Sequence, residues 1–565
     1  MTATQETQQE RSKNYHWIAL ANTTAAVFMS ALDGSIVLIA LPAIFGGIHL
    51  DPLEPRNIGY LLWMIMGYRL VQAVLVVTVG RLGDLFGRVK IYNAGFLVFT
   101  IASVLLSFDP FDAGRAAIWL IAWRVVQALG GSMLTANSAA ILTDAFPPER
   151  RGFALGINQI AALAGQFIGL TLGGLLAVWD WRAVFWVNVP VGIYGTIWAY
   201  TKLKETAASR KVKPRMDWWG NITFAVGLSA ILIGITEALH PYRDHTMGWT
   251  NPVVLIELIG GAALLVAFVI IEHTVAEPMF RLGLFSIRAF TAGNVAGLAA
   301  SIARGGLQFV LIIWLQGVWL PLHGYNYDQT PLWAGIFMLP LSIGFVLAGP
   351  ISGTLSDRFG SRGIATSGMA LFAITFVGLA LLPINFPYWL FAVLILLNGI
   401  SNGMFAAPNT SSIMSSVPAS YRGVASGMRA TFQNGGTALS IGVFTSLMIA
   451  GLAARLPHVL TGGLIAHGVS SDVAQQVGSL PPVSSLFATI LGVNPIQHLL
   501  QPTGALEHVT AAQRAQLTGH TFFPNLISGP FHTGLVVVFV TGAVLGVISA
   551  LASLLRGGRT VHLPD

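Results

Sequence analysis

The segment that decides the fold is Gly80-Arg81-Leu82-Gly83-Asp84-Leu85-Phe86-Gly87-Arg88-Val89-Lys90, which lies between two long apolar runs. A weaker copy follows later in the chain, Gly353-Thr354-Leu355-Ser356-Asp357-Arg358-Phe359-Gly360-Ser361-Arg362. Gly353, Asp357 and Gly360 each lie 273 residues after Gly80, Asp84 and Gly87. The same charged segment between corresponding spans of two halves indicates duplication, and duplicated halves that rock about a midplane site are typical of secondary transporters.

The composition requires a membrane around the chain. Of its 565 residues only 9% are charged and 54% are hydrophobic, too few charges to hydrate the surface of a soluble protein of this size. A helix that crosses a bilayer needs about 20 apolar residues. Fourteen runs are long enough, at 16–41, 58–80, 90–107, 117–140, 153–177, 184–201, 217–239, 252–272, 289–319, 332–354, 363–383, 387–411, 424–450 and 531–555. We therefore expect an all-α integral membrane protein with fourteen transmembrane helices.

Lysine and arginine fall mainly on one side of these spans. With the N-terminus placed inside, 20 of the 30 lie in cytoplasmic segments and 6 in outer loops, which is the bias that sets orientation. We expect both termini in the cytoplasm and the chain in the inner (cell) membrane of a bacterium. The net charge of +7 is scattered over short inner loops, so it predicts anchoring to lipid headgroups and not nucleic-acid binding.

A second duplicated signature divides the chain. Arg151-Gly152-x-Ala154-x-Gly156 opens the fifth span, and Arg422-Gly423-x-Ala425-x-Gly427 opens the thirteenth, 271 residues later. Six spans thus belong to each repeat, and two are left between them. The predicted parts are an N-terminal tail (1–15), a six-helix bundle (16–203), a linker with two extra helices (204–288), a second six-helix bundle (289–556) and a C-terminal tail (557–565).

The outer segment 451–530 is far longer than ordinary connections, so we expect it to have structure of its own, including a short helix around 504–517. It could form a packing cap over the outer mouth, or a gate or docking element for a partner. Its five histidines lack the close spacing of metal ligands, and the chain has no cysteine. We expect neither a metal site nor a cofactor.

These residues resemble the major facilitator superfamily, and in particular its fourteen-span drug:proton antiporter branch. The stretch from Gly80 to Lys90 is similar to the superfamily segment G-x-L-a-D-r-x-G-r-[RK] between spans 2 and 3. Leu32-Asp33-Gly34-Ser35-Ile36-Val37 resembles the branch's L-D-x-T-I-V in span 1, and Arg124-Val125-Val126-Gln127-Ala128-Leu129-Gly130 resembles R-x-x-Q-G-x-G in span 4. The resemblance covers nearly the whole membrane region and implies two six-helix bundles plus two intervening helices.

The fifth span is similar to the antiporter signature G-x8-G-x3-G-P-x2-G-G. All its glycines are present, at Gly156, Gly165, Gly169, Gly173 and Gly174, but Leu170 stands where the signature has proline. Glycines at this spacing let helices approach closely, so we expect the packing role to be kept. Proline would have kinked the helix, so its loss leaves the direction of coupling open.

Asp33 is the sharpest candidate for chemistry. An ionised side chain near the bilayer centre costs on the order of 3 kcal/mol by insertion scales, so a carboxylate inside an apolar span is a functional candidate. We expect Asp33 to carry the coupling proton, with Arg124 as its counter-charge in one conformation. Asp33 could instead be a permanently paired structural carboxylate, and Arg124 a hydrogen-bonding hub between helices.

The charged segments are expected to act outside the substrate site. The resemblance implies that Asp84 latches onto the opposite half, near Gly423, when the carrier faces outward. A carboxylate near a helix N-terminus also gains from the macrodipole. The expected latch comprises Gly80, Asp84, Gly87 and Arg88, with Asp357 and Arg358 as its weaker twin. The competing interpretation is a loop that only fixes topology.

Other polar and aromatic residues in the spans are candidates for the wall of a substrate cavity. We expect substrate contacts from Trp63, Arg69, Gln159, Arg304, Gln308, Gln316, Asn402 and Gln433. Most polar residues in membrane bundles only hydrogen-bond between helices, which is the competing interpretation for each. If Arg69 and Arg304 line the cavity, they indicate an anionic group in the substrate and disfavour purely cationic drugs.

The chain has no P-loop and no hydrolase motif, so an ion gradient is the expected energy source and no enzymatic activity is expected. We predict a monomeric, proton-coupled exporter of lipophilic or amphipathic compounds such as drugs, with protons, substrate and lipid as its partners. The alternative is a carrier of a specific endogenous lipid, organic anion or metabolite that need not be an antiporter, favoured by Leu170, Arg69 and Arg304. A third class is a membrane sensor or scaffold that transports nothing.

Overall fold

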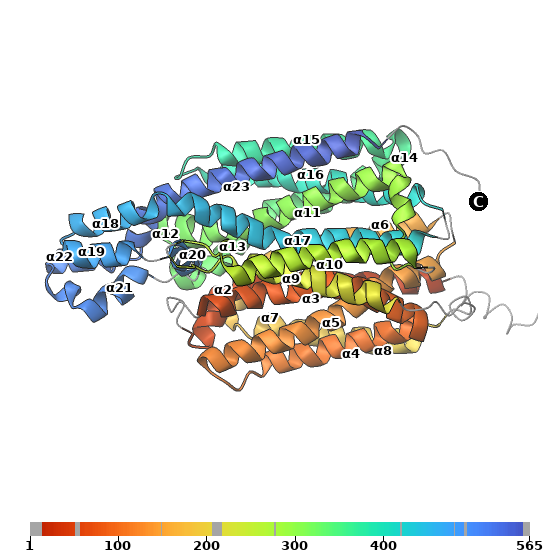
Figure 1. Cartoon of the computed structure of the whole chain (residues 1–565), viewed down its shortest axis with the longest axis horizontal. Helices are drawn as coiled ribbons and strands as arrows, with labels where there is room; N and C mark the ends of the chain where they lie inside the picture. The colour runs from red at the N-terminus through yellow and green to blue at the C-terminus, as the bar shows by residue number, and fades with distance from the viewer. Residues whose placement is uncertain are drawn as a thin grey trace, which may run out of the picture.

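The computed structural model describes residues 14–50, 57–147, 150–205, 217–243, 245–275, 278–418, 421–479, 481–490 and 494–556. Within these ranges the chain is built from helices that run nearly parallel along one axis (Figure 1). Thirteen of the described helices are long and apolar enough to cross a membrane. The sixth expected span, at 184–201, is divided into two shorter helices around Val187. The expectation of an all-α membrane fold is confirmed.

The first half contains α2 (Tyr15–Gly47), α3 (Asn57–Phe86), α4 (Arg88–Ser107), α5 (Ala113–Ala145), α6 (Arg151–Trp179), α7 (Ala183–Trp186) and α8 (Asn188–Lys202). The second half contains α11 (Arg288–Trp314), a π-helical turn (Leu315–Trp319), α12 (Leu320–Leu322), α13 (Thr330–Phe337), α14 (Leu339–Phe359), α15 (Ser361–Ala380), α16 (Tyr388–Ser415), α17 (Arg422–Ala453) and α23 (Phe522–Leu554). Between them lie α9 (Trp218–Glu237) and α10 (Pro252–Thr274). The domain boundaries given above remain predictions.

The charged segments are almost wholly helical, whereas the expected spans end at 80 and 354 and resume only at 90 and 363. Helix α3 continues to Phe86 and α4 begins at Arg88, with only Gly87 between them. Gly360 separates α14 from α15 in the same way. Both glycines have positive φ, 112° and 88°, a backbone conformation that side chains with a Cβ rarely adopt. The repeated glycine is therefore a one-residue joint between two helices.

The two halves meet mainly through α3 and α6 of the first half. Helix α3 of the first half packs against α17 of the second, and α6 packs against α13, α14 and α16. Helices α9 and α10 pack on one another, and α9 also contacts α3 and α17. Most of α10 is exposed, including Ile256, Ile259, Val266 and Ile270, as expected for an apolar helix that faces lipid.

The outer segment folds into short helices at the end opposite the start of α2 and the end of α23 (Figure 1). These are α18 (Leu456–Ala466), α19 (Ser471–Gly478), α20 (Pro482–Ile490), α21 (Pro495–Leu500) and α22 (Ala511–Leu517). Of these, α18, α20 and α22 pack on α11, α17 or α23 of the second half, and α19 packs on α18. The helix expected around 504–517 is only α22 and a preceding 3₁₀ turn (Ala505–Glu507). The last span begins at Phe522 and not at 531: Pro524 lies in its first turn, where proline is tolerated, and the helix continues through Pro530.

Helix α6 lies unusually close to α2 at its glycines. A Cβ on Gly169 would lie 2.6 Å from the carbonyl oxygen of Leu32, and one on Gly173 would lie 2.5 Å from that of Ile36. A Cβ on Gly174 would overlap the Pro331 carbonyl of the opposite half. The glycine signature thus packs α6 onto the turn of α2 that carries Asp33, and onto α13 across the interface between the halves.

Gly169→Ala should destabilise the protein. The added methyl must displace the α2 backbone, and overpacking of this kind costs about 1–3 kcal/mol. We expect a lower midpoint of thermal unfolding in detergent micelles. Gly156→Ala in the same helix is the matched control, because nothing lies within 4 Å of a Cβ there. Equal midpoints for the two variants would contradict the close approach of α6 and α2.

Candidate functional site

Asp33 and Arg124 form an ion pair in the middle of the first half. Arg124 Nη1 lies 2.5 Å from Asp33 Oδ2, and the two side chains are 3% and 0% exposed. Asp33 lies in α2 and Arg124 in α5. The predicted partnership of the two residues is present in this conformation. A buried guanidinium or carboxylate without a partner is energetically costly. Each residue of the pair therefore offsets the cost of burying the other.

Polar side chains from three further positions surround the pair. Asn188 Nδ2 donates to Asp33 Oδ1 at 2.6 Å, and Gln127 Nε2 donates to the same oxygen at 3.0 Å. Gln127 Oε1 accepts from Arg124 Nη1 at 2.8 Å, and the Tyr68 ring lies 4.1 Å from the guanidinium carbon. The carboxylate therefore has three donors from two helices, α5 and α8. Asn188 was not among the predicted residues, although an amide inside an apolar span was a signal for it.

A cavity lies between the two halves. Its volume is about 400 Å³, within the range of pockets that hold drug-sized molecules. Helices α2, α3, α5 and α6 of the first half and α11 and α17 of the second supply most of its wall. The lining begins at Gln166 and Arg304. It extends to Arg81, Asp84 and Arg88, at the end of the bundle where α2 begins and α23 ends. The cavity thus approaches that end, which we call the charged end.

Three arginines line this cavity without a carboxylate partner in the described part of the chain. They are Arg69 from α3, Arg304 from α11 and Arg429 from α17. Arg69 Nη2 donates to the Gly34 carbonyl at 2.9 Å, whereas Arg304 has only a 3.5 Å contact with Ser301. The Nε atoms of Arg304 and Arg429 are buried and make no hydrogen bond. Arg429 is a candidate from the sequence as a charge near the end of its span, but it was not among the residues expected to contact substrate.

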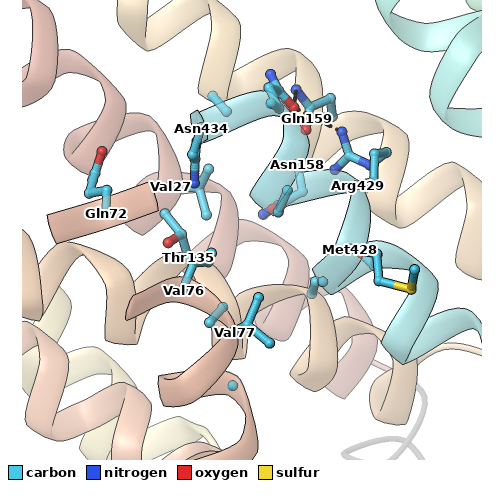
Figure 2. Close-up of a pocket in the computed structure, with 18 of the residues that line it drawn as sticks. Val27, Gln72, Val76, Val77, Thr135, Asn158, Gln159, Met428, Arg429 and Asn434 are labelled. Atoms are coloured by element: carbon cyan, nitrogen blue, oxygen red, sulfur yellow. Dashed lines mark hydrogen bonds between the residues drawn. The ribbon is translucent and has the colours of Figure 1, made fainter. Parts of the chain in front are cut away.

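Amides from both halves meet in the wall of the cavity. Gln433 Oε1 accepts from Gln159 Nε2 at 3.0 Å and from Arg429 Nη1 at 3.0 Å. Figure 2 shows Gln159 and Arg429 next to each other, with Asn158 and Asn434 close by. The carbonyl of Gln433 therefore joins α6 to α17 across the interface. Gln159 and Gln433, which were predicted separately, meet at the cavity.

The remaining predicted substrate residues lie elsewhere. Gln308 is buried and lines a small pocket beside Arg69 and Arg124. Gln316 is fully buried in the π-helical turn and donates to the Ile39 carbonyl at 3.1 Å. Trp63 and Asn402 lie outside the described cavity lining, and Asn402 bonds to Asn398 within α16. Gln316 thus closes the interface opposite the charged end, together with a 3.2 Å bond from Thr171 to the Gly335 carbonyl.

The residues of the expected latch lie at the charged end. Arg88 binds Asp84 at 2.8 Å and Asp144 at 2.7 Å, so Asp84 is paired within its own half in this conformation. Gly80 and Asp84 line the cavity, and Gly87 forms the joint described above. In the twin segment Arg358 is exposed, and the side chain of Asp357 is outside the described part of the structure.

A small pocket lies between Arg124 and the cavity. Its volume is about 20 Å³, and Gly34, Arg69, Arg124 and Gln308 are among the residues that line it. Arg69 lines both this pocket and the main cavity. A space of about 10–15 Å³ is enough for one water molecule. The geometry therefore allows a single water to approach Arg124 from the cavity side.

Asp33→Asn should destabilise the protein markedly, because it leaves Arg124 charged and buried without an anion. Breaking one partner of a buried pair costs about 3–5 kcal/mol, so the midpoint of thermal unfolding in micelles should fall. Asp33→Asn combined with Arg124→Gln should recover most of the loss. A single variant as stable as the parent would mean that the carboxyl group is already neutral in the folded protein.

Comparison with known proteins agrees with this architecture. The family model of the Major Facilitator Superfamily matches residues 23–441. The chain is 31% identical to the riboflavin transporter RibZ of Clostridioides difficile (strain 630), over 76% of this chain and 88% of that protein. It is 31% identical to the methyl viologen resistance protein SmvA of Salmonella typhimurium (strain LT2), over 82% and 90%. It is 28% identical to the tetracenomycin C resistance and export protein of Streptomyces glaucescens, over 83% and 84%.

Solved structures show the same fold at low sequence identity. A bacterial homologue of the human lysosomal transporter Spinster superposes with a TM-score of 0.54 at 15% identity, over 96% of this chain and 98% of that one. The proton:xylose symporter XylE superposes with a TM-score of 0.53 at 14% identity, over 85% and 95%. On the family match and the two 31% identical relatives, the chain belongs to the major facilitator superfamily and is a multi-pass membrane transporter.

Proposed function

We propose that this protein exports amphipathic small molecules from a bacterial cell in exchange for protons. The observation that carries the proposal is Asp33, a fully buried carboxyl group held by Arg124, Gln127 and Asn188, whose partner Arg124 lines a small pocket next to the cavity. A carboxyl group in this setting can bind and release a proton when the route to it opens. The relatives named for methyl viologen resistance and for resistance to and export of tetracenomycin C support export as the direction.

The orientation of the chain determines which way the cavity faces. Most lysines and arginines belong to segments at the charged end, so this end lies in the cytoplasm, with both termini. The conformation described here is then inward-facing, because the cavity extends toward that end and the bonds of Gln316 and Thr171 close the other. Each monomer contains the complete cavity, so we propose that it works alone.

Helix packing supplies a path from the proton site to the outer closure. Protonation of Asp33 removes the charge that holds Arg124, so α2 and α5 are free to shift. Helix α6 must follow α2, because Gly169 and Gly173 lie against the α2 backbone. The same helix contacts α13 of the opposite half at Gly174. A shift of α2 therefore reaches the contacts that separate the cavity from the outside, as alternating access requires.

The charged end provides the opposite closure. In the inward-facing conformation Asp84 and Asp144 share Arg88. When the halves approach at this end, Asp84 can exchange Arg88 for the backbone N–H groups at the start of α17, where the helix dipole favours a carboxylate. Arg88 keeps Asp144 during this exchange, so no charge is left without a partner. This is the latch in the form that the structure supports.

A carrier for one endogenous solute is the second candidate function. The riboflavin transporter is as similar to this chain as the resistance protein SmvA, at 31% identity. Leu170 replaces the proline of the antiporter signature and is buried in an α6 helix that continues from Arg151 to Trp179. The direction of coupling therefore has to be measured and does not follow from the signature.

Proton coupling can be measured in proteoliposomes with an imposed pH gradient. Labelled naphthylmethanesulfonate and naphthylmethyl-trimethylammonium serve as amphipathic probes whose charge does not change with pH. The parent protein should accumulate at least one probe at least tenfold in the compartment that is more acidic. Protons that leave this compartment drive the probe into it. The stabilised double variant with Asp33→Asn and Arg124→Gln should show downhill counterflow without accumulation.

Gly156→Ala is the control for reconstitution, since it touches neither the proton site nor the cavity wall. Full accumulation by the double variant would remove Asp33 from the mechanism. Absence of any flux with the parent protein would favour the sensor or scaffold.

A further inference from the structure

The charges that face the cavity are strongly unbalanced. Among the described residues that line it, five are arginines, Arg69, Arg81, Arg88, Arg304 and Arg429, and the single acidic residue is Asp84. Arg88 is already paired with Asp84 and Asp144. The inner part of the cavity, around Arg69, Arg304 and Arg429, is therefore positively charged and lacks an acid of its own among the described lining residues.

These inner arginines are costly to keep without an anion. Arg304 is 5% exposed and comes from the half opposite Arg69, and the two positive charges repel one another. Its Nε has no hydrogen-bond partner, and neither has that of Arg429. Buried charges are normally paired, and arginine presents a planar fork of donors that matches a carboxylate, sulfonate or phosphate. The arrangement supplies the donors that an anion site needs.

The rest of the wall is unsuited to cations. No aromatic side chain is among the described residues that line the main cavity, although aromatic faces are the usual means of binding organic cations. Phe405 and Phe432 line only a small chamber beside Arg304 and Arg429. The apolar wall of the main cavity is aliphatic and includes Val27, Val76, Val77 and Met428 (Figure 2).

We infer that the substrates of this carrier are amphipathic organic anions. The anionic group binds between Arg69 of the first half and Arg304 and Arg429 of the second, and the apolar body lies along the aliphatic wall. The inference rests on the proposed transport function and specifies its substrate class. It separates this chain from carriers of dications, because a second positive charge in this cavity would meet three arginines.

Anion binding would also connect the two halves. Before binding, Arg69 and Arg304 line the same cavity from opposite halves, and their like charges repel one another. An anion between them replaces repulsion with attraction and favours approach of the halves at the charged end. Arg69 donates to the carbonyl next to Asp33, that of Gly34, so the bound head group lies one residue from the proton site. The inside-negative potential of a bacterial membrane favours expulsion of an anion, which agrees with export.

The test compares ligands that differ only in the head group. Naphthylmethanesulfonate, the neutral naphthylmethanesulfonamide and naphthylmethyl-trimethylammonium share one apolar body, and a biphenyl series provides a second. Binding to the purified full-length protein is measured by calorimetry at equal pH and without a gradient, so the result does not depend on proton coupling. We expect the sulfonates to bind at least tenfold more tightly than the amides, and the ammonium compounds more weakly than either.

Variants identify the arginines that bind the anion. Arg304→Gln and Arg429→Gln should each weaken sulfonate binding at least tenfold and leave amide binding within twofold, and Arg304→Lys should recover part of the loss. The exposed Arg115→Gln is the matched control. Arg304→Gln should also raise or maintain the thermal midpoint, because it removes an unpaired buried charge, whereas the loss of a structural arginine would lower it.

The possible outcomes are distinct. Tighter binding of the ammonium series, or no binding by any sulfonate, overturns the inference. Sulfonate binding that is insensitive to Arg304, Arg429 and Arg69 also overturns it. Selective sulfonate binding without pH-driven accumulation in proteoliposomes supports the anion site and contradicts only the proton coupling of the proposed function.

Discussion

The structure depends on the removal of a carboxylate and a guanidinium from water in the middle of one six-helix half. Asp33 and Arg124 can remain there only because they lie 2.5 Å apart and because Gln127 and Asn188 saturate the carboxylate. The pair fixes α2 against α5 and α8, and the α6 glycines then fix α6 against α2. One electrostatic contact thereby sets the position of four helices, including the helix that reaches the opposite half.

The second half has the same general construction without an equivalent ion pair among its described residues. Its inner surface instead carries Arg304 and Arg429, whose charges face the cavity. In the first half Asp33 neutralises the positive charge of Arg124. In the second half a substrate anion in the cavity would neutralise the charges of Arg304 and Arg429. This asymmetry between duplicated halves separates a proton site from a substrate site and is compatible with coupling between them, because Arg69 lies between the two.

Much of the fold could be predicted because bilayer thickness sets helix length and because the duplicated signatures divide the chain. The pairing of Asp33 with Arg124 could also be predicted from the sequence, because two opposite charges in apolar spans require each other. Asn188 could not be chosen in this way, because an uncharged amide in a span has many possible partners. Which of the predicted polar residues line the cavity could not be known either. Gln159 and Gln433 lie on it and Asn402 does not, and this difference depends on helix rotation, which composition does not reveal.

The joint at Gly87 has a mechanical consequence. A flexible loop between two helices would absorb rotation of one without moving the other, but a single residue with φ of 112° offers little slack. A movement of α3 is therefore passed directly to α4 through Gly87, which lies close to Asp84 in sequence. Gly360 joins α14 to α15 in the same way. Each half thus has two helices joined by a single glycine at the same membrane surface. The short connection lets the two helices of each pair move together, besides setting the topology.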